Sequence, residues 1–225
     1  DGSDPHDAVV RDGVAYFVAN DQVHGAELWR SDGTPAGTFL LKDIRPGSSP
    51  ASPQHLTVSG SWVFFSAYSP DAGGELWRTD GTPDGTALVR DIRYGSSSSN
   101  ASELTDVNGT LFFVAEDGIT GRELWKSDGT EAGTVLVKDI HGGGNARDLI
   151  AAGGSLFFEA NDGIHGYELW VSDGTEAGTV LVKDLREGSN STSLQEFHAA
   201  AGRLFFLADT PEFGRELWVS DGTEA

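Results

Sequence analysis

The chain has 225 residues and a formal net charge of −20, with 15 Lys and Arg against 35 Asp and Glu. This charge excludes nucleic acid and anionic membrane surfaces as expected partners, because both attract basic proteins. Cysteine is absent, which excludes disulfides, thiolate metal sites and cysteine nucleophiles, and no apolar run approaches the roughly 20 residues needed for membrane insertion.

One sequence unit repeats along the whole chain. Its core is Glu-Leu-Trp, one further residue, and then Ser or Thr followed by Asp-Gly-Thr. It recurs at intervals of 45 or 48 residues, beginning at Glu27, Glu75, Glu123, Glu168 and Glu216. Such a period is typical of propeller blades or helical repeats. We divide the single domain 1–225 into units of approximately 1–46, 47–94, 95–142, 143–187 and 188–225.

Within each unit, four short apolar runs follow one another in chain order. In the third unit they cover residues 103–107, 110–116, 122–127 and 134–140, and we name their counterparts in every unit strands A, B, C and D. They are rich in β-branched and aromatic residues and lack helical periodicity, so they predict strands. Four antiparallel strands per unit are typical of a propeller blade.

The middle strands, such as 111–114, are apolar on both sides. A sheet requires this only when both of its faces are covered, and blades stacked around an axis meet that condition. The sequence therefore predicts an all-β fold, a β-propeller of five four-stranded blades. We expect these five to close a ring, and the alternative is that they are a segment of a larger one. The fifth blade is expected to lack its outer strand, because the chain stops at Ala225 within the turn that precedes strand D.

The six residues after strand C, 128–133 in the third unit, nearly repeat from unit to unit. Here Asp is expected to bond the backbone two residues on, and Gly to adopt positive φ. If this turn sets the register, Trp125 opposes Leu136 and a Glu opposes a basic residue. The predicted ion pairs are Glu27–Lys42, Glu75–Arg90, Glu123–Lys138 and Glu168–Lys183.

The string from Glu123 to Thr134, followed by Val137-Lys138-Asp139-Ile140, resembles the bacterial ELWxxDGT repeat family. The resemblance covers essentially the whole chain, although the last copy lacks the closing Val-Lys-Asp-Ile part. It implies an exported bacterial propeller or propeller array that is secreted or lies at the cell surface. It carries no established catalytic residues. Five-bladed lectin propellers are similar in size, which is an analogy of architecture only.

Two sets of loops are expected on one face of the ring. The D–A connections (45–53, 94–100, 141–145, 187–192) and the B–C loops (20–25, 69–74, 116–121, 161–166, 209–214) vary between units, whereas the turns on the opposite face nearly repeat. Function is usually carried by variable loops on a rigid scaffold, so we expect the binding site on this loop face. The candidate ligand-binding residues are His24, Tyr68, Tyr94, Asp117, Asp162, His165, Tyr167 and Phe213.

Among these candidates, the aromatic rings are suited to stacking on sugars, and also to covering blade packing. The carboxylates of Asp21, Asp117 and Asp162 are weak calcium candidates, because an Asp before Gly is commonly a hairpin turn and the EF-hand spacing is absent. His24 and His165 occupy equivalent positions, but zinc requires three or four convergent ligands. We expect no cofactor unless calcium binds.

Three functions follow from these patterns. The first is a non-enzymatic extracellular module for binding, scaffolding or adhesion, recognising glycan or a protein partner through the loop face. The second is a structural surface or polymer-forming subunit, whose incomplete fifth blade is completed by a donated strand. The third is a propeller hydrolase or lyase, which an acidic pair in its central channel would distinguish, although nothing in the sequence points to such a pair. No catalytic motif appears, so we expect no catalytic residues.

Overall fold

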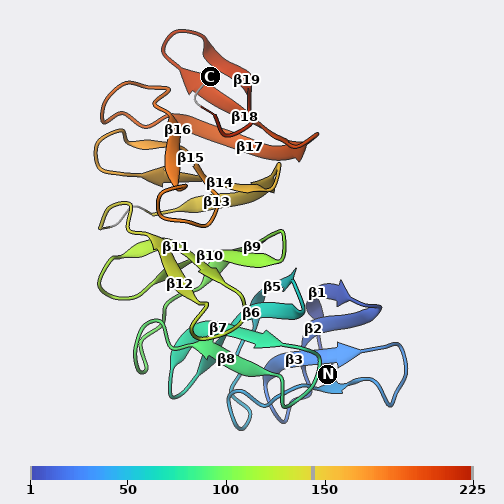
Figure 1. Ribbon diagram of the computed structural model, residues 1–225. Helices are drawn as coiled ribbons and strands as arrows, with labels where there is room; N and C mark the ends of the chain where they lie inside the picture. Colours follow the sequence, from blue (N-terminus) through green and yellow to red (C-terminus); the bar gives the residue numbers. More distant parts are fainter. Residues whose placement is uncertain (1, 143–144, 224–225) are drawn as a thin grey trace.

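The computed structural model describes residues 2–142 and 145–223. They form 19 strands, arranged as five separate antiparallel sheets, and within this part of the chain no helix is present (Figure 1). It follows that none of the described residues belongs to a helix long and apolar enough to cross a membrane. The prediction of an all-β fold built from five small sheets is confirmed.

The strands of each sheet follow one another in chain order as a meander. The first sheet contains β1 (His6–Arg11), β2 (Val14–Asn20), β3 (Ala26–Ser31) and β4 (Phe39–Leu40). The second contains β5 (Gln54–Ser59), β6 (Trp62–Ser69), β7 (Gly73–Thr79) and β8 (Ala87–Arg90). The third contains β9 (Ser102–Val107), β10 (Thr110–Glu116), β11 (Arg122–Ser127) and β12 (Val135–Lys138).

The fourth sheet contains β13 (Arg147–Ala152), β14 (Ser155–Asn161), β15 (Tyr167–Ser172) and β16 (Val180–Lys183). The fifth contains three described strands, β17 (Ser193–Ala200), β18 (Arg203–Thr210) and β19 (Gly214–Ser220). The four runs predicted in the third unit correspond to β9, β10, β11 and β12, and their boundaries agree to within two residues.

The first strand of each sheet lies next to the first strand of the following sheet, in the order β1, β5, β9, β13 and β17. The sheets therefore stack along one inner edge, as blades of a propeller do. In Figure 1 they follow an arc, with β1 and β17 at separate ends. The structure shows a propeller-type array, and the closed five-unit ring expected from the sequence is not seen in it.

Alternate residues of each middle strand enter different cores. Leu111 and Phe113 of β10 are buried with Trp125 and residues of the second sheet, whereas Phe112 and Val114 are buried with residues of the fourth. Four such clusters lie between the five successive sheets. Adjacent side chains on a strand point to opposite faces, so a run that is apolar throughout is stable only between two neighbours. This prediction is confirmed.

The turn after β11 forms as predicted. Oδ1 of Asp128 accepts hydrogen bonds from Thr130 N at 2.8 Å and Thr130 Oγ1 at 2.7 Å, and Gly129 has a φ of 92°. The last glycine of the turn, Gly133, has no room for a side chain, since a Cβ there would lie 2.1 Å from Oδ1 of Asp128. The recurring Asp and the second recurring Gly are thus parts of one compact turn.

The predicted ion pairs are wrong, although Trp125 does oppose Leu136. The register shifts by one residue between Leu124 and Trp125, so Lys138 opposes Leu124 instead of Glu123. Three of the four basic side chains reach the next sheet instead. Carbonyl oxygens there accept hydrogen bonds from Lys42 (Thr86 O, 3.0 Å), Arg90 (Thr134 O, 2.6 Å) and Lys138 (Thr179 O, 2.8 Å). The bulge thus converts a predicted contact within a sheet into links between sheets.

Candidate functional site

The two variable sets of loops lie on one face and contact each other. At the end of the first D–A connection, Ser52 N donates to Ala26 O at 3.2 Å, and Tyr68 N donates to Ala51 O at 2.9 Å. The fourth connection repeats the first of these contacts, from Thr192 N to Tyr167 O at 2.9 Å. Each D–A connection therefore runs between the ends of neighbouring strands, where it adjoins the B–C loops.

A buried carboxylate holds each described connection to its sheet. Glu75 accepts hydrogen bonds from the backbone N–H groups of Ile92, Arg93 and Ser99 at 3.2, 3.3 and 2.9 Å. Glu27, Glu123 and Glu168 accept the equivalent bonds from Ile44, Ile140 and Leu185 at 3.3 Å each. The side chain that was predicted to form an ion pair instead organises the loop face.

These carboxylates are fully buried, and burial disfavours their charged form. Burial raises the pKa of Glu27 and of Glu168 to about 7, against the opposing effect of the N–H donors, and it also raises the pKa of Glu75. Sequence reasoning missed this role because backbone donors have no sequence signature. The sequence did contain one signal for this role: the same Glu occurs in all five units.

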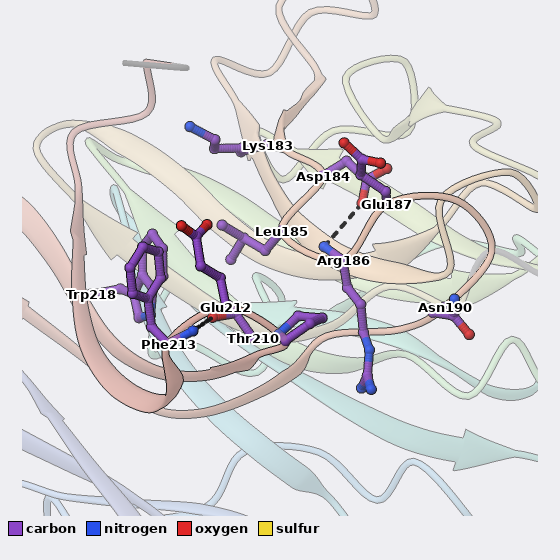
Figure 2. Close-up of a pocket in the computed structure, with 11 residues that line it drawn as sticks. Lys183, Asp184, Leu185, Arg186, Glu187, Asn190, Thr210, Glu212, Phe213 and Trp218 are labelled. Carbon is purple, nitrogen blue, oxygen red and sulfur yellow. Dashed lines mark hydrogen bonds between the residues drawn. The ribbon is translucent and has the colours of Figure 1, made fainter.

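A groove opens on the loop face between the fourth and fifth sheets, with a cavity volume of about 670 Å³ (Figure 2). The fourth D–A connection forms one wall, and the last B–C loop with β19 forms the other. Its lining residues are Lys183, Asp184, Leu185, Arg186, Glu187, Asn190, Thr210, Pro211, Glu212, Phe213 and Trp218. The expected binding face therefore carries a groove of the size of small-ligand sites.

The aromatic wall of this groove is open to solvent. Phe213 is 58% exposed, and its ring packs edge-on against Trp218 with 6.3 Å between the ring centroids. The tip of the last B–C loop is held by a hydrogen bond from Phe213 N to Thr210 Oγ1 at 3.3 Å. The groove thus presents an apolar ring on an ordered loop beside charged side chains.

The guanidinium of Arg186 points away from Asp184 in Figure 2. It has no hydrogen-bond or ion-pair partner within 2–142 and 145–223, although the backbone N of Arg186 donates to Asp184 Oδ1 at 3.1 Å. The equivalent arginines are occupied: Arg93 pairs with Glu116 at 2.8 Å, and Arg45 lies over the Tyr68 ring at 4.9 Å. The fourth connection is therefore the one of these three whose arginine is available to a ligand.

Of the predicted ligand-binding residues, Phe213 is the one that lines this groove. Tyr94 lies elsewhere on the connections and is 93% exposed. Tyr68 and Tyr167 each carry an arginine over the ring, Arg45 and Arg147 respectively, the latter at 4.0 Å from the centroid. The structure does not bring these tyrosines together.

The predicted Asp and His residues of the B–C loops bond to one another within each loop. Asp21 Oδ2 lies 2.6 Å from His24 Nδ1, and Asp162 Oδ2 lies 2.7 Å from His165 Nδ1. The hydrogen bonds from His24 lower the pKa of Asp21 to about 2, and the bonds to Asp21 and Asp162 raise the pKa of both histidines. The loops are therefore ordered by their own side chains.

Asp117 caps its loop in the same way, accepting from Ile119 N at 2.7 Å and Thr120 N at 2.8 Å. Across the described ranges, no group of three or more His, Cys, Asp or Glu side chains is arranged to hold a metal ion. Calcium binding by Asp21, Asp117 or Asp162 stays a hypothesis.

Apolar side chains at the tips of three B–C loops were not selected from the sequence. Val23, Ile119 and Ile164 occupy equivalent positions and are exposed. Exposed apolar side chains gathered on one face are a feature of protein-binding surfaces. The sequence could have pointed to them, because an apolar residue recurs two positions after the Asp of each of these three loops.

The inner edge of the array carries a second feature that sequence reasoning missed. One residue of each first strand adopts positive φ at a register irregularity, namely Asp7, His55, Glu103, Asp148 and Glu196, with φ between 51° and 58°. Glu103, Asp148 and Glu196 line one open hollow of about 530 Å³. The sequence pointed to no acidic pair at this edge, although the shared spacing of these positions was visible.

The chain matches no family model and no curated protein. Comparison with solved structures finds proteins of similar fold. Its structure is similar to a prolyl endopeptidase (TM-score 0.61, 15% identity, covering 100% of this chain and 35% of that one). It is also similar to puromycin hydrolase (TM-score 0.57, 15% identity, covering 97% of this chain and 36% of that one). A puromycin-hydrolyzing peptidase of Mycobacterium tuberculosis is similar as well (TM-score 0.55, 15% identity, covering 96% of this chain and 37% of that one). At this identity the likeness concerns the fold, and the chain spans about a third of the length of these enzymes.

Proposed function

We propose that this chain is a non-enzymatic recognition module of an extracellular or cell-surface protein, which binds glycan or a protein partner through its loop face. The observation that carries the proposal is the groove between the fourth and fifth sheets. It joins the exposed ring of Phe213 to the unpaired guanidinium of Arg186. An aromatic ring supports stacking on a sugar or an apolar side chain, and a guanidinium supports binding of hydroxyl, carbonyl or carboxylate oxygens.

The buried glutamates favour recognition because they hold the loops in place before a ligand arrives, which reduces the ordering cost of binding. Val23, Ile119 and Ile164 add exposed apolar side chains to the B–C loops of three sheets, which suits a protein partner. The extracellular location rests on the resemblance of the repeats to exported bacterial proteins. No cofactor is required, and calcium binding by the B–C loops is tested together with the ligand.

The test is a glycan array and a peptide array probed with the purified chain, in calcium and again in chelator. Phe213→Ala and Arg186→Ala are each expected to weaken binding about tenfold, as removal of a central contact does. Tyr94→Ala is the matched control, since Tyr94 is an exposed aromatic residue on the same set of connections outside the groove. Silence on both arrays, or equal loss from the control, would overturn the proposal.

The second candidate is a propeller hydrolase or the propeller part of one. The structural likeness to puromycin hydrolase and prolyl endopeptidases gives it more support from comparison than the first candidate receives. The hollow lined by Glu103, Asp148 and Glu196 supplies carboxylates of the kind that general acid and base catalysis uses. Against it, no hydroxyl group in the described part of the chain bonds to a histidine ring.

Hydrolysis separates the two candidates. The chain is incubated with aminoacyl and prolyl peptide substrates, and turnover that Asp148→Asn abolishes would favour the hydrolase. Asn also tolerates positive φ, so the fold is expected to survive this substitution. Binding without turnover would favour the recognition module.

A further inference from the structure

A second pocket lies between the second and third sheets, at the loop-face end where their first strands β5 and β9 begin. Its volume is about 350 Å³, which is small for a ligand site but sufficient for a ligand of few atoms. Its lining residues are Gln54, His55, Ser66, Gly74, Asn100, Ala101, Ser102 and Arg122. None of these lines the groove beside Phe213, and the second and third sheets each pack on a sheet at both faces. The pocket is therefore independent of the groove and of the first and last sheets.

The described lining of this pocket contains no carboxylate, although the chain has 35 Asp and Glu. It offers a guanidinium, an imidazole, two carboxamides and two hydroxyl groups. His55 accounts for part of this difference, because the equivalent residues of the other first strands are acidic, namely Asp7, Glu103, Asp148 and Glu196. A chain with a net charge of −20 repels anions over most of its surface, so a pocket lined without carboxylates favours an anion locally.

Arg122 supplies the positive charge of the pocket. Its Nη2 donates to Ser102 Oγ at 2.6 Å, and within the described part of the chain no carboxylate forms an ion pair with it. Glu116 lies opposite Arg122 across β10 and β11, but it pairs with Arg93 at 2.8 Å. The other donors of the Arg122 guanidinium are therefore available to a carboxylate, which a guanidinium binds through two parallel hydrogen bonds.

Arg215 occupies the equivalent position in the fifth sheet and is paired differently. It donates to Gln195 Oε1 at 2.8 Å and lies 4.0 Å from Glu196 Oε1. Gln195 corresponds to Ser102, since each opposes the same position of its middle strand. The fifth sheet thus gives its arginine an acidic partner, and the third sheet leaves Arg122 without one among the described residues.

The second sheet departs from the repeat at two further positions that line the pocket. Ser66 places a hydroxyl where the other middle strands have Val18, Val114, Glu159 and Leu207. Its own hydrogen bond to Gln54 O is long, at 3.5 Å. Gly74 leaves space where the other third strands have Ala26, Arg122, Tyr167 and Arg215. Since the other sheets form without these residues, their presence together in one pocket favours a binding role over a structural one.

We propose that this pocket binds a small hydroxylated carboxylic acid, with an acidic sugar of the uronic acid type as the expected ligand. Arg122 binds the carboxylate. Ser66 and the carboxamides of Gln54 and Asn100 bond the sugar hydroxyls. A free monosaccharide and the end of an acidic polysaccharide share this chemistry, and the proposal does not depend on ligand binding in the groove.

The test is calorimetric titration of the 225-residue chain with galacturonate and with an oligogalacturonate. Galactose, which lacks the carboxylate, and acetate, which lacks the hydroxyls, are the matched analogues. The acidic sugar is expected to bind about tenfold more tightly than either analogue. Binding of the monosaccharide would support the proposal with a free acid as ligand, and binding of the oligomer alone would support it with a polysaccharide as the source. Binding of neither, or equal affinity for galactose or acetate, would overturn it.

Substitution of the arginine locates the binding. Arg122→Ala is expected to weaken binding of the acidic sugar about tenfold, because it removes the charge-assisted hydrogen bonds. Arg215→Ala is the matched control, since it removes the equivalent arginine outside the pocket, and it is expected to leave the affinity unchanged. Equal loss from the two variants would contradict the proposal.

Two variants give the second sheet the residues of other units, so the fold is expected to survive them. His55→Glu copies β9 and β17 and is expected to abolish binding, because its carboxylate would repel that of the ligand. Ser66→Val copies β2 and β10 and is expected to weaken binding about fivefold through loss of a hydrogen bond. Unchanged affinity in His55→Glu would count against the pocket. Phe213→Ala should leave the affinity for the acidic sugar unchanged, so failure of the groove and failure of this pocket are distinguishable.

Discussion

The fourth and fifth sheets share one motif and place it in different surroundings. Glu168-Leu169-Trp170 and Glu216-Leu217-Trp218 are the same tripeptide on equivalent strands, yet Glu168 and Leu169 are buried whereas Glu216 and Leu217 are exposed. The fourth sheet has a neighbouring sheet on each face and a fourth strand on its edge, and the fifth lacks these in the described structure. The comparison teaches that this motif is not stable by itself: its burial depends on the units around it.

Truncation of the two tryptophans should give the largest difference. Trp170→Ala removes a buried side chain that packs on Phe158 and Leu181, and it is expected to cost about 3–5 kcal/mol of the free energy of unfolding. Trp218→Ala should cost clearly less, because Trp218 lines the open groove between the fourth and fifth sheets. Urea unfolding of both variants measures the difference, and equal losses would contradict the comparison.

Removal of Glu168 and of Glu216 should give the second largest difference in stability. Glu168→Ala leaves the N–H groups of Leu185 and Thr192 buried without an acceptor, at an expected cost of about 3 kcal/mol and a fall in Tm of about 6–12 °C. Glu216→Ala should leave Tm unchanged. A scanning calorimeter reads both values, and a similar fall for Glu216→Ala would show that its carboxylate is already bonded.

The pH dependence of the free energy of unfolding should also distinguish Glu168 from Glu216. The folded pKa of Glu168 is raised to about 7 from 4.5 by burial, so its stabilising contribution is present below about pH 4.5 and is lost as pH rises through 7. The free energy of unfolding should therefore fall by about 2 kcal/mol between pH 5 and pH 8 from this residue. Glu168→Gln should remove that part of the slope. Glu216→Gln should retain the full slope. Because both variants keep His24 and His165, the difference between their slopes belongs to Glu168.

The turns after β15 and β19 should give the smallest and most similar effects. Asp173 Oδ1 accepts Thr175 N at 2.8 Å, and Asp221 Oδ1 accepts Thr223 N at 3.0 Å, so the turn forms in both sheets. Asp173→Ala is expected to cost about 0.5–1 kcal/mol, because the carboxylate is exposed and screened. Asp221→Ala should show no larger loss in the same urea titration. A large loss for Asp221 alone would mean that its turn has a further partner.

Parts of the candidate site could be predicted and parts could not. The loop face followed from the variation between units, and Phe213 was selected as an exposed aromatic residue of that face. Arg186 was not, because its importance lies in the absence of the partners that Arg93 and Arg45 possess. Whether a side chain is already paired depends on contacts between distant segments, which no single unit of sequence contains.

The sequence by itself determined the features that act over a few residues: the strands, the Asp-Gly-Thr turns and the repeat that stacks the sheets. Only the tertiary structure decided the one-residue bulge before Trp125, the burial of Glu27, Glu75, Glu123 and Glu168 against backbone donors, and the open arc in place of a closed ring. The physical reason is that strand and turn preferences are local. Register, burial and hydrogen-bond partners depend on which neighbouring unit covers each face, so the same Glu-Leu-Trp is a buried anchor in four sheets and an exposed edge in the fifth.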